Sequence, residues 1–227
     1  MIKAILIDVD NTLLDFGKCS LESMKTAYRE FGLPFTDEVF PVFNRVNDGL
    51  WRHIEAGTLT KAELHRIRWQ LIFDELGTRA DGVAFEARFY ELIQSSHETV
   101  PGAEALLRRL HGKYIVAAAS NASHDQQVRR LTAAGLIHYI DYVFTSEDAS
   151  VPKPSAAFFD YCLGCLGITD PAEAAMIGDS LSADISGSVA YGLRTVWFNF
   201  AGEPVPEGLQ VDLIADSLAD IEKALPF

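Results

Sequence analysis

The chain has 227 residues, of which 48% are hydrophobic and 22% charged, a composition that supports a packed core and excludes a disordered or low-complexity protein. Its 19 Lys and Arg residues stand against 32 Asp and Glu residues, a formal net charge of −13. This balance excludes partners that need a basic surface, namely nucleic acid polymers and anionic membranes. The three cysteines are too few for a disulfide scaffold.

The beginning of the chain shows neither a signal peptide nor a membrane span. The apolar run Ile2–Val9 is short and ends at acidic residues, unlike a secretory signal. No other apolar run approaches the roughly 20 residues that cross a bilayer. We therefore expect a cytoplasmic protein, monomeric or a small homo-oligomer.

The first predicted elements are one strand and then a block of helices. Ile2–Val9 is apolar and rich in β-branched residues, as in a buried parallel strand. After Asp15 the spacing of apolar residues becomes helical, and this pattern continues until Pro101. The predicted helices are Ser20–Phe31, Asp37–Ala56, Thr60–Leu76 and Val83–Ser95, the third opening with a capping box formed by Thr60 and Glu63.

Beyond Pro101 helices and strands alternate, which predicts a parallel sheet with helices on both faces. The predicted strands are Tyr114–Ala119, Tyr142–Thr145, Ala175–Ile177, Arg194–Phe198 and Leu213–Ile214. The predicted helices are Ala103–His111, Asp125–Ala134, Ala156–Leu166, Ala183–Tyr191 and Leu218–Leu225. We therefore predict an α/β fold, a Rossmann-like core over residues 1–15 and 98–227, with an all-helical domain inserted at residues 16–97.

Polar residues follow four of the predicted strands. In open parallel sheets, ligands bind at the carboxyl ends of the strands. A single acid in a loop is usually a turn or cap residue, but polar clusters after four strands in succession are hard to explain in that way. These clusters are Asp8, Asp10 and Thr12; Ser120 and Asn121; Lys153; and Asp179 with Asp184.

The chemistry of these residues suits a metal ion and a phosphoryl group. Several adjacent carboxylates cannot all be ionised without a positive counter-charge. Oxygen ligands without His or Cys favour Mg²⁺ over zinc. A cation, a lysine and a hydroxyl around a free carboxylate would neutralise a phosphoryl group while the carboxylate attacks it in line.

The four clusters, in this order, resemble the motifs of the haloacid dehalogenase (HAD) superfamily, with a helical cap inserted after the first motif. The resemblance implies that Asp8 is the nucleophile and that Asp10 first protonates the leaving oxygen and then activates water. It implies that Ser120, Asn121 and Lys153 bind the phosphoryl group. It further implies Mg²⁺ ligands at Asp8, the backbone carbonyl of Asp10 and Asp179, with Thr12 and Asp184 as supporting residues behind them.

Asp10 also separates activities within this superfamily. A carbon–halogen dehalogenase has no leaving ester oxygen to protonate and lacks this second aspartate. Its presence therefore favours a phosphatase or a phosphomutase. The alternatives that stay open are a phosphatase of sugar phosphates or phosphoglycolate, a phosphomutase, and a catalytically silent phosphate-binding protein.

The inserted helices give a finer indication of the substrate. Residues 46–57, followed by Thr60, Glu63 and the pair Arg68-Trp69, resemble the cap of the YjjG/YfnB-like branch of this superfamily. That branch contains nucleotidases that act on nucleoside monophosphates. The resemblance implies a 5′-nucleotidase acting on a small phosphorylated metabolite. Trp51 is the candidate to stack on a base and Arg52 to meet a polar substrate edge, against the alternative that Trp51 and Trp69 are core residues of the cap.

Overall fold

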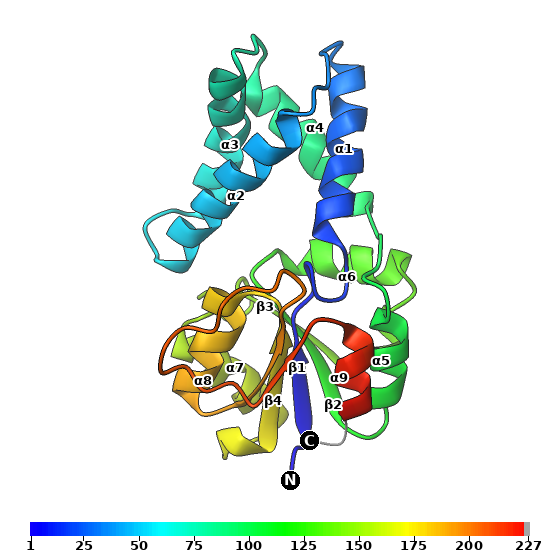
Figure 1. Cartoon of the computed structure of the whole chain (residues 1–227), viewed down its shortest axis with the longest axis vertical. Coiled ribbons are helices and arrows are strands. Elements are labelled where there is room, and N and C mark those ends of the chain that lie inside the picture. The colour runs from blue at the N-terminus through cyan, green and yellow to red at the C-terminus, as the bar shows by residue number, and fades with distance from the viewer. Residues whose placement is uncertain (225–227) are drawn as a thin grey trace. The chain divides into compact units, whose positions relative to one another are not determined.

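Figure 1 shows the computed structural model of the chain, which describes residues 1–224. The chain divides into two compact units. One comprises residues 1–16 together with the chain from His97 onward, and the other is Gly17–Ser96. No helix within the described residues combines the length and the hydrophobicity that crossing a membrane requires.

The first unit is built on one sheet of six parallel strands in the order β3-β2-β1-β4-β5-β6. The strands are β1 (Ala4–Ile7), β2 (Ile115–Ser120), β3 (Tyr142–Thr145), β4 (Ala174–Gly178), β5 (Arg194–Phe198) and β6 (Leu213–Ala215). The direction of the strand order reverses between β1 and β4, which is where open parallel sheets form their binding crevices. The predicted α/β fold class is confirmed.

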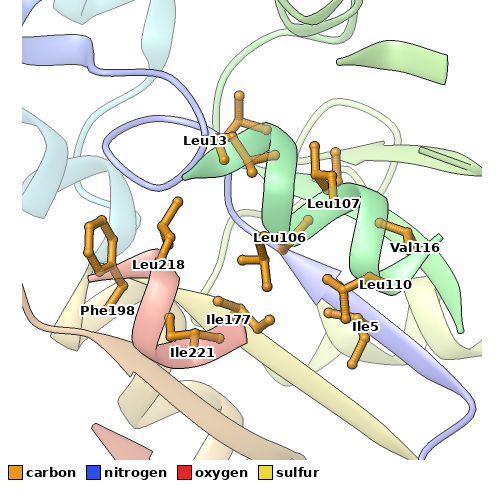
Figure 2. Packing of buried hydrophobic residues seen from close by; sticks show 14 of the residues in the cluster. Ile5, Leu13, Leu106, Leu107, Leu110, Val116, Ile177, Phe198, Leu218 and Ile221 are labelled. Atoms are coloured by element: carbon orange, nitrogen blue, oxygen red, sulfur yellow. The ribbon is translucent and has the colours of Figure 1, made fainter. Parts of the chain in front are cut away.

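Alternate residues of the central strands supply two separate cores. Ile5 and Ile7 of β1 belong to a cluster with residues of α5 (Ala103–Leu110) and α9 (Leu218–Ala224), which Figure 2 shows in close-up. Ala4 and Leu6, on the opposite face of the strand, pack in a cluster with Phe158 and Phe159 of α7 (Ala156–Leu166). Because side chains alternate along a strand, one buried sequence serves both helical layers.

Two further α-helices of this unit are α6 (His124–Ala133) and the short α8 (Gly187–Tyr191), and two single 3₁₀ turns lie at Ile137–Tyr139 and Pro171–Glu173. The predicted elements differ from the observed ones mostly at their ends. The predicted strand Ile2–Val9 is shortened because the carbonyl of Val9 accepts hydrogen bonds from the amides of Leu13 and Leu14, which starts a turn. The last predicted helix ended at Leu225, which lies outside the described residues.

The helical unit contains four helices between β1 and β2. They are α1 (Phe16–Glu30), α2 (Val39–Glu55), α3 (Lys61–Leu76) and α4 (Gly82–Ser95). The predicted capping box is present, since the Thr60 side chain accepts from the Glu63 amide and the Glu63 side chain accepts from the Thr60 amide. Helix α1 begins before the predicted Ser20, whose hydroxyl instead donates to the carbonyl of Gly17 within the first turn.

Aromatic rings form the core of the helical unit. Trp69 is fully buried, stacks on Phe43 and contacts Phe85 and Phe89. Trp69 is therefore a core residue, as the alternative for this position predicted. Most of the stability of a protein helix comes from packing and not from its intrinsic helix propensity, and these large aromatic side chains supply that packing.

A buried ion pair also lies in this unit. Arg68 donates to both carboxylate oxygens of Glu86, at 3.0 and 2.5 Å, and to the side-chain oxygen of Asn47 at 2.9 Å. Its guanidinium lies over the rings of Phe43 and Phe89. Burial alone would raise the pKa of Glu86, but Arg68 and His65 outweigh it and hold that pKa below its usual value. The pair links α2, α3 and α4 with its charges compensated.

The two segments that connect the units run side by side. The amide of Asp15 donates to the carbonyl of Glu98, and the amide of Val100 donates to the carbonyl of Leu13. Leu14 and Thr99 form an antiparallel bridge between these bonds. The chain thus leaves the sheet unit and returns to it through one short backbone pairing.

Helices α3 and α4 approach closely at Gly82, and this yields a prediction. A Cβ atom at Gly82 would lie 2.5 Å from the backbone nitrogen of Gln70. We expect Gly82→Ala to lower the free energy of unfolding by about 1–3 kcal/mol, because a backbone atom cannot move aside. Gly49 in α2 is the control, since a Cβ there meets nothing within 4 Å. Gly49→Ala is expected to stabilise by about 0.5–1 kcal/mol. Urea denaturation measures both, and equal effects of the two substitutions would contradict the close approach.

Candidate active site

The first part of the site is the tight turn that follows β1. Asp8 continues the strand, with its amide donating to the carbonyl of Ile177 at 2.8 Å. The chain then reverses at Asn11, whose φ of 62° lies in the left-handed region that Asn tolerates better than most residues. The turn keeps Asp8 and Asp10 at the carboxyl end of the central strand, where the binding crevice of such a sheet is expected.

Lys153 lies at the centre of the site and contacts three of its parts. Its side chain is almost completely buried, and its Nζ donates to three acceptors: Asp8 Oδ1 at 2.7 Å, Asp184 Oδ1 at 2.6 Å and the carbonyl of Ala119 at 2.6 Å. An ammonium group has three donors, and here all three point at oxygen atoms. Lys153 therefore joins Asp8 after β1, Ala119 near the end of β2 and Asp184 after β4.

Asp179 and Asp184 complete an acidic cluster with Asp8. Oxygen atoms of the three carboxylates lie within 4.8 Å of one another. Thr12 donates to Asp179 at 3.2 Å, and the amide of Ser180 donates to Asp184 Oδ2 at 3.0 Å. Both oxygens of Asp184 are thus occupied by protein donors, one of them from Lys153.

The backbone after β4 is shaped to admit Asp184. A Cβ atom at Gly178 would lie 2.3 Å from Asp184 Oδ2, so only glycine leaves the space that this carboxylate fills. The predicted helix Ala183–Tyr191 is wrong in its first part. A π-helical turn, η3 (Leu181–Ser186), comes first, with the amide of Ile185 donating to the carbonyl of Ser180, and α8 follows. Single π-helical turns are frequent at functional sites.

The electrostatics of the cluster show an excess of negative charge. Burial raises the pKa of Asp8 to about 7, with Lys153 opposing this rise and Asp184 adding to it. Burial, Asp8 and Asp184 together raise the pKa of Asp179 well above its ordinary value. Burial would lower the pKa of Lys153, but Asp184 and Asp8 outweigh it and raise that pKa. One ammonium group does not balance three carboxylates, two of them buried and one half-buried.

This donor set fits Mg²⁺. The cluster offers carboxylate oxygens, and no His or Cys belongs to it. Hard oxygen ligands are what Mg²⁺ prefers, and a dication would supply the positive charge that the raised pKa values of Asp8 and Asp179 show to be missing. Asp8 and Asp179 are the carboxylates best suited as ligands, since Asp184 is held by Lys153 and Ser180.

Ser120 and Asn121 lie beside this cluster, at the end of β2. The side chain of Asn121 bonds to the main chain of Lys153 twice, donating to its carbonyl at 3.0 Å and accepting from its amide at 2.8 Å. Asn121 thereby fixes the segment that carries the lysine. Its phosphate contact stays a prediction, as does that of Ser120.

Sequence reasoning missed two residues here, Gln127 and Arg130 on α6. Gln127 donates to Asp10 Oδ2 at 2.7 Å and to the hydroxyl of Ser120 at 2.8 Å, and Arg130 donates to Asp10 Oδ1 at 2.5 Å. Both are fully buried. The helical spacing indicates only their burial, because Gln127 and Arg130, three positions apart, share the helix face of the buried Leu131.

The two cap candidates belong to the helical unit. Trp51 is half-buried and packs against a small cluster of Leu50, Ile54 and Leu64. Arg52 is exposed and lies one turn after Asp48, with which it interacts electrostatically. Burial, opposed by Asn47 and Arg52, raises the pKa of Asp48. The substrate contacts of Trp51 and Arg52 stay predictions.

Proton competition at the acidic cluster leads to a prediction about Mg²⁺. Without metal, Asp8 has a pKa of about 7 and that of Asp179 is also raised, so below pH 7 these groups must lose protons to coordinate an ion. We expect Mg²⁺ affinity to fall by at least about tenfold per pH unit below pH 7. Because unfolded carboxyls ionise near pH 4, the metal-free protein also loses stability as pH rises from about 4 to 7.

Thermal denaturation with and without Mg²⁺ measures both effects. The rise in Tm caused by Mg²⁺ should be larger at pH 8 than at pH 5.5. Equal rises at the two pH values would contradict the raised pKa values.

Known proteins resemble this chain along its length. The model of the haloacid dehalogenase-like hydrolase family matches residues 2–192. The pyrimidine 5′-nucleotidase YjjG of Escherichia coli is 30% identical, covering 97% of this chain and 96% of its own. The pyrimidine 5′-nucleotidase PynA of Streptococcus pneumoniae is 31% identical, covering 87% and 84%.

A solved structure agrees with these matches. The magnesium-bound crystal structure of the HAD-hydrolase YfnB from Bacillus subtilis superposes with a TM-score of 0.92 at 27% identity, covering 100% of this chain and 99% of that one. The ordered motifs, the parallel sheet with its helical insertion and these similarities agree, and the chain belongs to the haloacid dehalogenase-like hydrolases, as an enzyme of the HAD phosphatase type.

Proposed function

We propose that this enzyme is a Mg²⁺-dependent phosphomonoesterase whose main substrates are nucleoside 5′-monophosphates. The observation that carries the chemical part is the position of Lys153 between Asp8 and Asp184, with Asp179 in the same cluster. The ammonium group of Lys153, beside the buried carboxylate of Asp8, is suited to binding a phosphoryl group where that carboxylate can reach the phosphorus.

In this proposal Asp8 and Asp10 carry the covalent steps. An oxygen of Asp8 attacks phosphorus, the bond to the leaving oxygen breaks, and its electron pair goes to that oxygen as Asp10 donates a proton. Asp10, now a carboxylate, takes a proton from water as the water attacks the phosphorus of the aspartyl-phosphate. Phosphate leaves and the Asp8 carboxylate is restored. Two steps of this kind are the general pattern of nucleophilic catalysis.

The remaining site residues bind and orient. Ser120, Asn121 and Lys153 would hold the phosphoryl oxygens, and Lys153 is the best placed because it already contacts Asp8. Asp8, Asp179 and the backbone carbonyl of Asp10 would hold Mg²⁺, which supplies positive charge to the transferring group when bound. Thr12 would keep Asp179 in place through the hydrogen bond it already donates.

The choice of leaving group is assigned to the helical unit. The cluster around Lys153 recognises features that every phosphomonoester shares, so it cannot distinguish a nucleoside from a sugar. We assign residues 1–15 and 98–227 to catalysis and residues 16–97 to substrate selection, with Trp51 and Arg52 as the selecting residues. Two of the similar proteins are named pyrimidine 5′-nucleotidases, which supports a nucleoside monophosphate as the substrate.

The covalent mechanism is tested by Asp8→Asn. The substitution keeps the shape of the side chain and removes the attacking charge, so we expect turnover to fall by at least about a thousandfold. Asp125→Asn, at an exposed position on α6, is the control and should keep normal turnover. EDTA should abolish activity of the unsubstituted enzyme and Mg²⁺ should restore it. Near-normal phosphate release from folded Asp8→Asn protein would refute the mechanism.

Substrate selection is tested with Trp51→Ala on a panel of phosphate esters. A base stacked on an aromatic side chain contributes roughly 1–3 kcal/mol, so kcat/KM for nucleotides should fall about ten- to a hundredfold. That for p-nitrophenyl phosphate should change much less, and Trp51→Phe should keep most of the nucleotide activity. An equal loss on both esters would assign Trp51 to packing alone.

The same panel separates the alternatives. Preference for sugar phosphates or phosphoglycolate in the unsubstituted enzyme would remove the nucleotidase assignment and leave the phosphatase. An isomerised product without released phosphate would identify a mutase, and no turnover of any ester would indicate a silent binding protein.

A further inference from the structure

Asp10 is held by a buried pair of side chains that none of the four motifs contains. Gln127 Nε2 donates to Asp10 Oδ2 at 2.7 Å, and Arg130 Nη1 donates to Asp10 Oδ1 at 2.5 Å. The same amide of Gln127 also donates to the Ser120 hydroxyl at 2.8 Å, and its own oxygen lies 3.5 Å from Arg130 Nη1. One helix face thus contacts both oxygens of Asp10 and the residue at the end of β2.

Burying Gln127 and Arg130 costs desolvation free energy, and stability does not explain why that cost is met here. Arg130 has no exposed side-chain surface, whereas 27% of the Asp10 side chain is exposed. An exposed carboxylate can be solvated by water and needs no buried partner. Replacing buried ion pairs by apolar residues of similar volume is often neutral or stabilising, so stability alone gives little reason for an arginine here.

We propose that Gln127 and Arg130 are positioning residues for the proton transfers of Asp10. They fix the plane of the Asp10 carboxyl group and join it to Ser120, so that the proton donor and the phosphoryl-binding hydroxyl form one rigid unit. This inference rests on the proposed function, in which Asp10 protonates the leaving oxygen.

The geometry leaves room for the transferred proton. Each carboxyl oxygen has two acceptor sites, and each oxygen of Asp10 receives one of these two donors. The proton that Asp10 gives to the leaving oxygen, and later takes from water, can occupy a remaining site while both hydrogen bonds persist. Neither Gln127 nor Arg130 needs to exchange a proton or touch the substrate.

The two residues are placed to prevent the rotation that would misdirect this proton. A terminal carboxyl group rotates easily, because its torsion is broad and roughly two-fold. Contacts to both of its oxygens, from side chains that are themselves buried, remove that freedom. A misplacement of about 1 Å in a reacting group can cost a factor of about a hundred in rate.

The test compares esters that differ in their need for a proton. Phenyl phosphate has a poor leaving group that requires protonation, whereas 4-nitrophenyl phosphate has a good one that requires little. We expect Gln127→Leu and Arg130→Met to lower kcat/KM, which covers the steps up to departure of the leaving group, about ten- to a hundredfold on phenyl phosphate and only a few-fold on 4-nitrophenyl phosphate. The matched controls on α6 are Gln126→Leu, also buried, and Arg129→Met, which is exposed, and both should keep the wild-type ratio of the two rates.

A double substitution shows whether Gln127 acts through Asp10. Asp10→Asn alone should itself lower kcat/KM far more on phenyl phosphate than on 4-nitrophenyl phosphate. Adding Gln127→Leu to Asp10→Asn should then cost little more, since the residue it positions no longer transfers a proton. If Arg130→Met fails to fold, Gln127→Leu and Arg130→Lys, which keeps the charge without the planar fork, carry the comparison.

Two results would overturn the positioning role while leaving the function of Asp10 intact. One is an equal loss on both esters in the Gln127 and Arg130 variants. The other is a full additional loss from Gln127→Leu in the Asp10→Asn background. If Asp10→Asn shows no difference between the esters in kcat/KM, the role of Asp10 as proton donor in the proposed function fails, and the positioning role fails with it.

Discussion

The compensation of buried negative charge is the constraint on which the site depends. Within the cluster, four carboxylates meet two cationic side chains, all close to the carboxyl ends of β1, β2 and β4. A buried charge is tolerated only when it is paired, and these four carboxylates carry two more negative charges than the two cationic side chains can balance. A divalent ion has the charge that closes this balance. The six residues are Asp8, Asp10, Asp179, Asp184, Lys153 and Arg130.

The backbone around the cluster is adapted to this crowding. Gly178 leaves the space that Asp184 occupies, and a Cβ at Gly187 would lie 2.5 Å from the Cβ of Pro154, the residue after Lys153. The indole of Trp197 donates to the carbonyl of Asp179 at 2.9 Å, so a buried residue of β5 also supports the acidic loop. Small residues and backbone contacts, together with the ion pairs of Lys153, thus hold in place three carboxylates that repel one another.

Much of this arrangement could be predicted from the sequence, for identifiable reasons. The central strands β1 and β4 are apolar throughout because both faces of the sheet are covered there. Polar residues follow the strands, so Asp8, Ser120, Lys153 and Asp179 could be assigned to one edge of the sheet. The contacts of Gln127 and Arg130 with Asp10 join residues that are far apart in the chain, and no local spacing encodes them. The π-helical turn at Asp184 was missed because a side chain accepting from the amide of Ser180 competes with helical bonding.

The paired segments at Asp15 and Glu98 allow the helical insertion to change without disturbing the sheet unit. The two ends of the insertion are already held side by side by backbone hydrogen bonds. A change in the length or sequence of the insertion therefore adds no entropic cost of loop closure to the sheet and breaks no strand. A recombination event with both crossovers near these positions would exchange one set of helices for another in a single step. Evolution can therefore produce new members of the family from an existing sheet unit by replacing one continuous stretch of coding sequence.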